Sequence, residues 1–139
     1  MTKALLPVVA GALALIGSAA LAAPPLPPGT PDFASLKGNP VAGKAVFAQC
    51  GVCHSIVPNK NGIGPSLYGV VDRPSASVPG FTYSAANKNS HIVWTEPVLY
   101  AYLIAPQQYV PGTKMIFAGL KDAQKRADVI AYLKSKPTS

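Results

Sequence analysis

Near the middle of the chain stand Cys50-Gly51-Val52-Cys53-His54. Two thiols three positions apart, followed at once by a histidine, have the spacing at which a c-type haem is attached to protein. The thiols can form thioethers with two vinyl groups on one edge of a porphyrin, and the imidazole then lies under the iron, to which it offers a neutral nitrogen. We therefore expect one covalently attached haem c, held by Cys50 and Cys53, with His54 as an axial ligand of its iron.

Three other sites fit these residues less well. A thioredoxin-like Cys-x-x-Cys pair needs a βαβ context, and the flanking sequence shows none. A structural zinc site usually takes four Cys or His ligands, and the chain offers only Cys50, Cys53, His54 and His91. A disulfide across so short a loop would leave His54 without a role. The ligand inventory therefore favours haem.

A second axial ligand follows by elimination. Met115 is the only methionine left once the first residues are removed, and it follows Pro111-Gly112, a turn that can bring a side chain inward. Its thioether is a soft ligand that favours ferrous iron and raises the reduction potential. The remaining candidate, His91, lies in a polar stretch and is expected to be a solvated surface residue.

The N-terminus is typical of an export signal. Lys3 precedes a long uncharged apolar run, and Ala20-Leu21-Ala22 supplies an A-x-A cleavage pattern. Residues 1–22 are therefore expected to be a cleaved signal peptide, although the run is also long enough to be an uncleaved membrane anchor. Residues 23–39 are rich in proline and are expected to form a disordered tail, or a spacer if the anchor is retained. In both cases the domain lies outside the cytoplasm, and the periplasm is the expected compartment.

The rest of the chain, residues 40–136, predicts a single all-α domain with long loops. Residues 41–49 form a short expected helix with Val46 and Phe47 as its large apolar residues. Residues 95–104 begin with a Thr cap, an acid and an early proline, and should stop before Pro106. Residues 122–134 begin at the cap Asp122 and present an apolar face. That face contains Ala127, Val129, Ile130 and Leu133.

These motifs together resemble class I cytochrome c, in particular its mitochondrial-type branch and soluble bacterial relatives. The resemblance spans residues 41–134 and keeps the family's order of motifs. The matching stretches are Cys50–His54, Gly64–Gly69, Tyr83–Asn89, Trp94 and Pro111–Gly119. It implies three main helices packed around one haem, with one haem edge exposed.

The resemblance also implies roles for individual residues. Pro65 would accept a hydrogen bond from the ring of His54, and Phe117 would cover the haem edge. Tyr83 and Trp94 match positions that bind a buried propionate, whose charge Arg73 would offset. The polar cluster around the methionine would consist of Asn87, Tyr102 and Thr113. Gly43 and Phe47 would pack against Val129 and Tyr132 where the first and last helices cross.

The sequence also departs from the family pattern. Asp72 replaces the usual glycine before Arg73 and is expected to pair with that arginine. Glutamines stand at 49, 107 and 108, where the family commonly has lysines. The basic ring expected to dock partners is therefore thinned, and Lys88, Lys114 and Lys121 remain of it.

The function expected from this set is single-electron transfer, not catalysis, because two axial ligands leave the iron no open position. The net charge of +7 falls by one when Lys3 is removed and reaches about +4 with two propionates, which suits brief, salt-sensitive docking to acidic complexes. The expected partners are a quinol-oxidising cytochrome bc complex and a terminal oxidase or photosynthetic reaction centre. The alternatives are a tethered carrier dedicated to one complex and an open-site haem enzyme or gas sensor. No recognition motif or basic run indicates nucleic acid.

Overall fold

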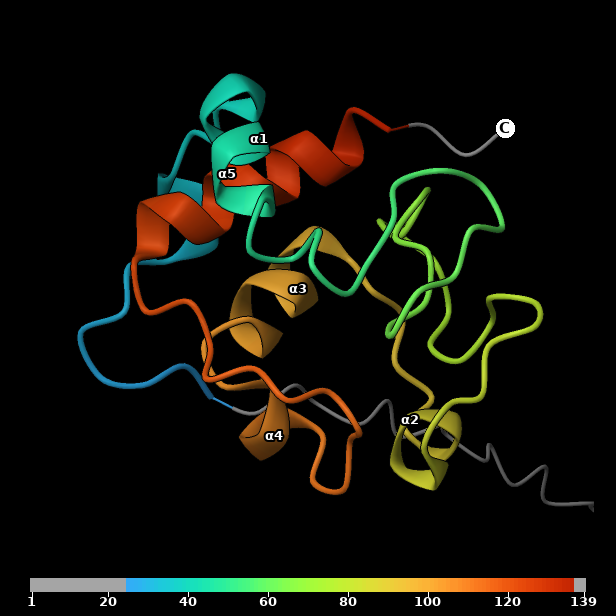
Figure 1. Cartoon of the computed structure of the whole chain (residues 1–139). Helices are drawn as coiled ribbons and strands as arrows, with labels where there is room; N and C mark the ends of the chain where they lie inside the picture. The colour runs from blue at the N-terminus through green and yellow to red at the C-terminus, as the bar shows by residue number, and fades with distance from the viewer. Residues whose placement is uncertain (1–24, 137–139) are drawn as a thin grey trace, which may run out of the picture.

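The computed structural model describes residues 25–136, and its regular elements are all helical (Figure 1). In chain order they are η1 (Phe33–Ser35), α1 (Pro40–Phe47), α2 (Ala85–Asn89), α3 (Glu96–Tyr102), α4 (Pro106–Tyr109) and α5 (Ala123–Lys134). Within residues 25–136 the only β pairing is an isolated bridge between Pro74 and Val93. The all-α expectation is confirmed. None of the helices described is long and apolar enough to cross a membrane, and residues 1–22 lie outside the described part of the chain.

Helices α1 and α5 cross in direct contact (Figure 1). Gly43 makes the crossing possible, because a Cβ at this position would lie 1.9 Å from the carbonyl oxygen of Asp128. One turn later, the ring of Phe47 packs on Tyr132 with centroids 5.4 Å apart. The expected contact of the first and last helices is therefore confirmed, and it places the end of α1, just before the Cys-x-x-Cys-His motif, on the core.

Side-chain caps explain where the three main helices begin. The carboxamide oxygen of Asn39 accepts from the backbone N–H of Val41 at 2.9 Å, ahead of Pro40 in the first turn. Thr95 caps α3 and Asp122 caps α5 in the same manner. The expected apolar face of α5 is buried, with Ile130 completely inaccessible. Helix α3 ends at Tyr102, two residues earlier than expected.

Two short helices, α2 and α4, were not expected from the sequence. Helix α2 is capped by Ser84, whose hydroxyl accepts from the N–H of Asn87 at 3.1 Å. Helix α4 starts at Pro106, where the preceding helix was expected to stop, and has no side-chain cap. Neither has the length or the apolar period that identifies a helix in sequence.

Residues 31–39 are not a free tail. The backbone N–H of Asn39 donates to the carboxylate of Asp128 at 2.8 Å, and the hydroxyl of Tyr100 donates to the carbonyl of Pro31 at 2.8 Å. The ring of Phe33 packs on that of Tyr100, with centroids 5.3 Å apart. The packed part of the chain therefore extends N-terminally of residue 40 at least to residue 31, and the expectation of a tail or spacer over residues 31–39 is corrected.

Candidate functional site

The Cys-x-x-Cys-His motif forms a helical turn that continues from α1. The backbone N–H groups of Cys50 and Gly51 both donate to the carbonyl of Phe47 at 2.8 Å. The N–H of His54 then donates to the carbonyl of Cys50 at 2.9 Å. Three side-chain groups, two thiols and an imidazole, are therefore held on one short turn that is anchored to the buried end of α1.

The imidazole of His54 has a fixed orientation. Its Nδ1 lies 2.7 Å from the carbonyl oxygen of Pro65. Because a carbonyl only accepts, Nδ1 must carry the proton, which leaves Nε2 as a free lone pair. Burial lowers the pKa of His54, the hydrogen bond to Pro65 opposes this, and the charge of Arg73 adds a smaller lowering. The ring is thus held as a neutral imidazole whose Nε2 could bind a metal.

Gly64 is a site residue whose role sequence reasoning did not identify. A Cβ built on it would lie 2.3 Å from Cε1 and 2.6 Å from Nδ1 of His54. The loop that carries Pro65 can approach the imidazole face only because residue 64 has no side chain. The resemblance implied that Pro65 lies next to the ring, but it did not show that residue 64 must lack a side chain.

The two thiols are free and partly buried. Burial, with a smaller contribution from the neighbouring Cys53, raises the pKa of Cys50 to about 11. Within residues 25–136 no three His, Cys, Asp or Glu side chains gather as a cluster for a bare metal ion. The donor set of two thiols, one imidazole and one distant thioether suits a cofactor that brings most of its own iron ligands, which is the case for haem.

The methionine side of the site is assembled from three segments. The hydroxyl of Tyr102, at the end of α3, donates to Sδ of Met115 at 3.0 Å. The hydroxyl of Thr113 donates to the carboxamide oxygen of Asn87 at 3.1 Å and accepts from the N–H of Met115 at 3.3 Å. Ser84 also donates to that oxygen of Asn87, at 3.0 Å. The expected cluster of Asn87, Tyr102 and Thr113 is therefore present around Met115.

Aromatic rings pack against Tyr102 of this cluster. The ring of Tyr102 packs between Trp94 and Tyr109, with centroid separations of 4.7 and 5.8 Å. Burial raises the pKa of Tyr102 to about 12, against a smaller lowering by its hydrogen bond with Thr113. The phenol therefore stays a neutral donor toward sulfur. Trp94 is buried, and its backbone N–H and C=O bond to Arg73 and Asp72 respectively.

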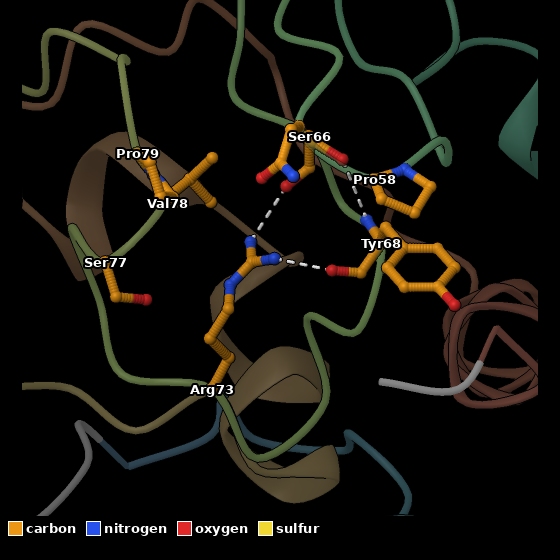
Figure 2. A pocket seen from close by; sticks show the side chains of 8 residues that line it. Pro58, Ser66, Tyr68, Arg73, Ser77, Val78 and Pro79 are labelled. Carbon is orange, nitrogen blue, oxygen red and sulfur yellow. Dashed lines mark hydrogen bonds between the residues drawn. The ribbon is translucent and has the colours of Figure 1, made fainter. Parts of the chain in front are cut away.

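Arg73 lines a cavity of about 200 Å³ together with Ser66, Tyr68 and the turn 77–79 (Figure 2). Its guanidinium donates to the carbonyls of Tyr68 at 2.6 Å and Ser66 at 2.9 Å. Burial lowers the pKa of Arg73, yet a guanidinium stays charged and has five N–H donors, so donors remain for an anion. The hydroxyl of Tyr83 accepts from the N–H of Val78 at 3.3 Å, at the edge of this cavity.

The expected pair of Asp72 and Arg73 does not form. Asp72 is exposed, and the one ion pair among the described residues joins Lys134 to Glu96. Asp72 has a φ of +62°, a left-handed conformation that favours glycine and that Asp tolerates. The residue therefore occupies a backbone position, not a charge-pairing one.

The remaining predicted residues lie around the methionine loop. Phe117 is half-buried, and Lys88, Lys114 and Lys121 are exposed. Lys121 donates to the carbonyl of Ile104 at 2.6 Å. The hydrogen bond between Asn87 and Thr113 brings the neighbouring Lys88 and Lys114 onto adjacent segments. His91 is exposed, as expected.

Comparison with known proteins decides the family. The model of the Cytochrome c family matches residues 40–137. The chain belongs to the cytochrome c family. Cytochrome c2 of Rhodopila globiformis is 54% identical over 99 residues, which are 70% of this chain and 93% of that protein. Cytochrome c2 of Blastochloris viridis is 50% identical over 121 residues, 86% of this chain and 90% of that protein.

Solved structures agree with the sequence relatives. The structure of cytochrome cH from Methylobacterium extorquens superposes with a TM-score of 0.68 at 43% identity, and the match covers 71% of this chain and all of that one. Membership of the cytochrome c family implies one covalently attached haem c. The thiol pair, the imidazole with a free Nε2 and the half-buried thioether fit that cofactor.

Proposed function

We propose that this chain carries single electrons in the periplasm, between a quinol-oxidising cytochrome bc complex and a terminal oxidase or photosynthetic reaction centre. When bound, the haem supplies an iron that gains or loses one electron. The observation that supports the proposal is that each candidate axial side chain has its own hydrogen-bond partner. Pro65 orients His54 at 2.7 Å, and Tyr102 donates to Met115 at 3.0 Å.

The residues around the site have distinct tasks in this proposal. Cys50 and Cys53 would hold the cofactor covalently, and His54 and Met115 would supply the two protein ligands of its iron, which would leave no open position for a substrate. Arg73, with Tyr83 and Trp94 nearby, provides positive charge and donors for a propionate in the cavity of Figure 2. A site in which the ligands are already oriented changes little when the charge changes, which keeps electron transfer fast.

The test is an optical spectrum of the ferric protein purified from a periplasmic extract. A low-spin spectrum with the weak red band of sulfur-to-iron charge transfer is expected. A high-spin spectrum would contradict the proposal and favour the open-site enzyme or gas sensor. The mass of the purified chain tests the processing: a chain that begins at Ala23 supports a cleaved signal, and a full-length chain in the membrane fraction supports a tethered carrier.

The proposed docking of partners is tested through the three exposed lysines. Changing Lys88, Lys114 and Lys121 together to glutamine is expected to lower the electron-transfer rate with an acidic partner complex about tenfold at low salt, because attraction between the lysines and the acidic partner speeds association. The matched control changes three exposed lysines elsewhere, Lys37, Lys44 and Lys125, together to glutamine. Equal losses in both variants would mean that net charge, not this group of lysines, governs docking.

A further inference from the structure

The N-terminal segment, residues 25–39, is attached to the domain along its length, and we call it the strap. At its C-terminal end Asn39 is held by Asp128, and Gln124 donates from its side chain to the carbonyl of Lys37 at 2.9 Å. In the middle, Tyr100 donates to Pro31 at 2.8 Å. The strap, blue in Figure 1, runs from the side of α4 past α3 to α5.

The N-terminal end of the strap lies beside α3 and α4, the helices that carry Tyr102 and Tyr109. Pro25, Leu26 and Pro27 line a cavity of about 90 Å³, and α3, α4 and the turn between them line the rest of it. A turn directs the strap onto this surface: the N–H of Thr30 donates to the carbonyl of Pro27 at 3.1 Å, and Gly29 has a φ of +78°. Prolines on both sides of Leu26 limit its backbone freedom, so the contact costs little ordering entropy.

Tyr109 connects this end of the strap to Met115. It lines the same cavity as Leu26, and its ring meets that of Tyr102 edge to face, with centroids 5.8 Å apart and an interplanar angle of 88°. Tyr102 in turn donates its hydroxyl to Sδ of Met115. Leu26, which is 36% exposed, thus borders the same cavity as Tyr109, and ring and hydrogen-bond contacts continue from Tyr109 through Tyr102 to the candidate ligand.

We propose that Leu26, in the strap, is a positioning residue for Met115, acting through Tyr109 and Tyr102. The inference rests on the proposed function, since it assumes that Met115 binds the iron. Packing by the strap keeps Tyr109 against Tyr102 and so keeps the hydroxyl of Tyr102 aimed at the sulfur. Loosening the strap then raises the fraction of molecules in which Met115 has left its place.

The experiment measures the binding of imidazole to the ferric holoprotein, because imidazole enters only when Met115 has left. The apparent dissociation constant for imidazole is inversely proportional to the fraction of molecules that are open. Leu26→Ala is expected to bind imidazole about threefold more tightly than wild type, and Leu26→Met is expected to restore the wild-type value. The matched control, Gln124→Ala, frees the strap near Lys37 and is expected to change imidazole binding by less than about 1.5-fold.

A double-mutant cycle with Tyr102→Phe tests the route. If the strap acts through the hydroxyl of Tyr102, the threefold effect of Leu26→Ala nearly vanishes in the Tyr102→Phe background. An undiminished effect there would overturn the route. An unchanged imidazole affinity in Leu26→Ala, even with a lower free energy of unfolding, would show that the strap supports the fold alone and would overturn the inference.

The two levels of failure are distinguishable in the wild-type protein. If the wild-type ferric spectrum lacks the red charge-transfer band, Met115 is not a ligand, and the inference fails together with the proposed function. If the band is present and Leu26→Ala binds imidazole as the wild type does, only the inference fails.

Discussion

The two sides of the site are built differently. On the histidine side, the thiols, the imidazole, Gly64 and Pro65 all lie within residues 50–65, on one turn and the loop that follows it. On the methionine side, Thr113 bonds to Asn87 across 26 positions of sequence, and Tyr102 bonds to Met115 across 13. One side is specified by a continuous stretch and the other by the agreement of separate segments. We therefore expect the methionine side to open first and the histidine side to tolerate change least.

The largest effect is expected on the histidine side, from Gly64→Ala. The new methyl group would meet the His54 ring at 2.3–2.8 Å, so the loop with Pro65 must move away from the imidazole. The free energy of unfolding of the holoprotein should fall by about 3 kcal/mol, measured by denaturant titration. The control is Gly51→Ala in the same motif, where the nearest atom would lie 3.5 Å from the methyl group. Equal losses in the two variants would mean that the crowding of His54 is not the cause.

On the methionine side, Met115→Leu is expected to remove the candidate iron ligand while lowering the free energy of unfolding less than Gly64→Ala does. Leucine nearly keeps the volume of methionine but cannot bind iron, so the red charge-transfer band should vanish and the ferric iron should become high-spin. Loss of a metal ligand should lower the free energy of unfolding by about 2 kcal/mol. Ile116→Leu is the neighbouring control, because Ile116 is 93% exposed. A low-spin spectrum that survives in Met115→Leu would show that another residue is the second ligand.

Thr113→Val tests the polar cluster alone. It removes the bonds to Asn87 and to the N–H of Met115, while Ser84 continues to donate to Asn87. The loss should be about 1 kcal/mol in the free energy of unfolding, together with tighter imidazole binding. The exposed Thr82 provides the control Thr82→Val. Weaker imidazole binding in Thr113→Val would contradict a holding role for this cluster.

The smallest effect at neutral pH is that of the Tyr102 proton. Burial raises its pKa from 10.0 to about 12, so the folded state prefers the neutral phenol. The resulting stabilisation is fully present below pH 10 and is lost as the pH rises through about 12. In this alkaline window the free energy of unfolding should fall less steeply in Tyr102→Phe than in wild type. Parallel curves for the two proteins would exclude Tyr102 as the titrating group.

The sequence predicted the parts of the molecule that depend on neighbouring residues. The caps Thr95 and Asp122 predicted the starts of α3 and α5, and the motif Cys50–His54 predicted that two thiols and an imidazole lie together. Helix α4 was not predicted because its N-cap, Ala105, provides no side-chain hydrogen bond. The tail expected before residue 40 was wrong because proline density indicates an extended chain but does not say whether that chain is docked.

Two arginines have backbone carbonyls as partners, which the sequence could not indicate. Arg126 looks like a surface cation in the pattern of α5, yet it is 1% exposed. Its guanidinium donates to the carbonyls of Leu120 and Lys121 and lies 4.3 Å from the centroid of the Tyr100 ring. The predicted ion pair of Asp72 with Arg73 was wrong for a similar reason. Arg73 donates to backbone carbonyls instead, and a backbone carbonyl carries no sequence signal.

The missing side chain at Gly43 also bears on the order in which the molecule is completed. Helix α5 is the last of the described helices in chain order, and synthesis proceeds from the N-terminus, so the thiols of the motif exist well before the helix that α1 must meet. Until Asp128 has been synthesised, Gly43 has no backbone to pack against. Bringing residues 43 and 128 together closes a long loop, and that entropic cost is met only when α5 packs on α1. Cys50 and Cys53 therefore lie outside a closed core until α5 packs on α1, and the last of the described helices in chain order is the one that completes that core.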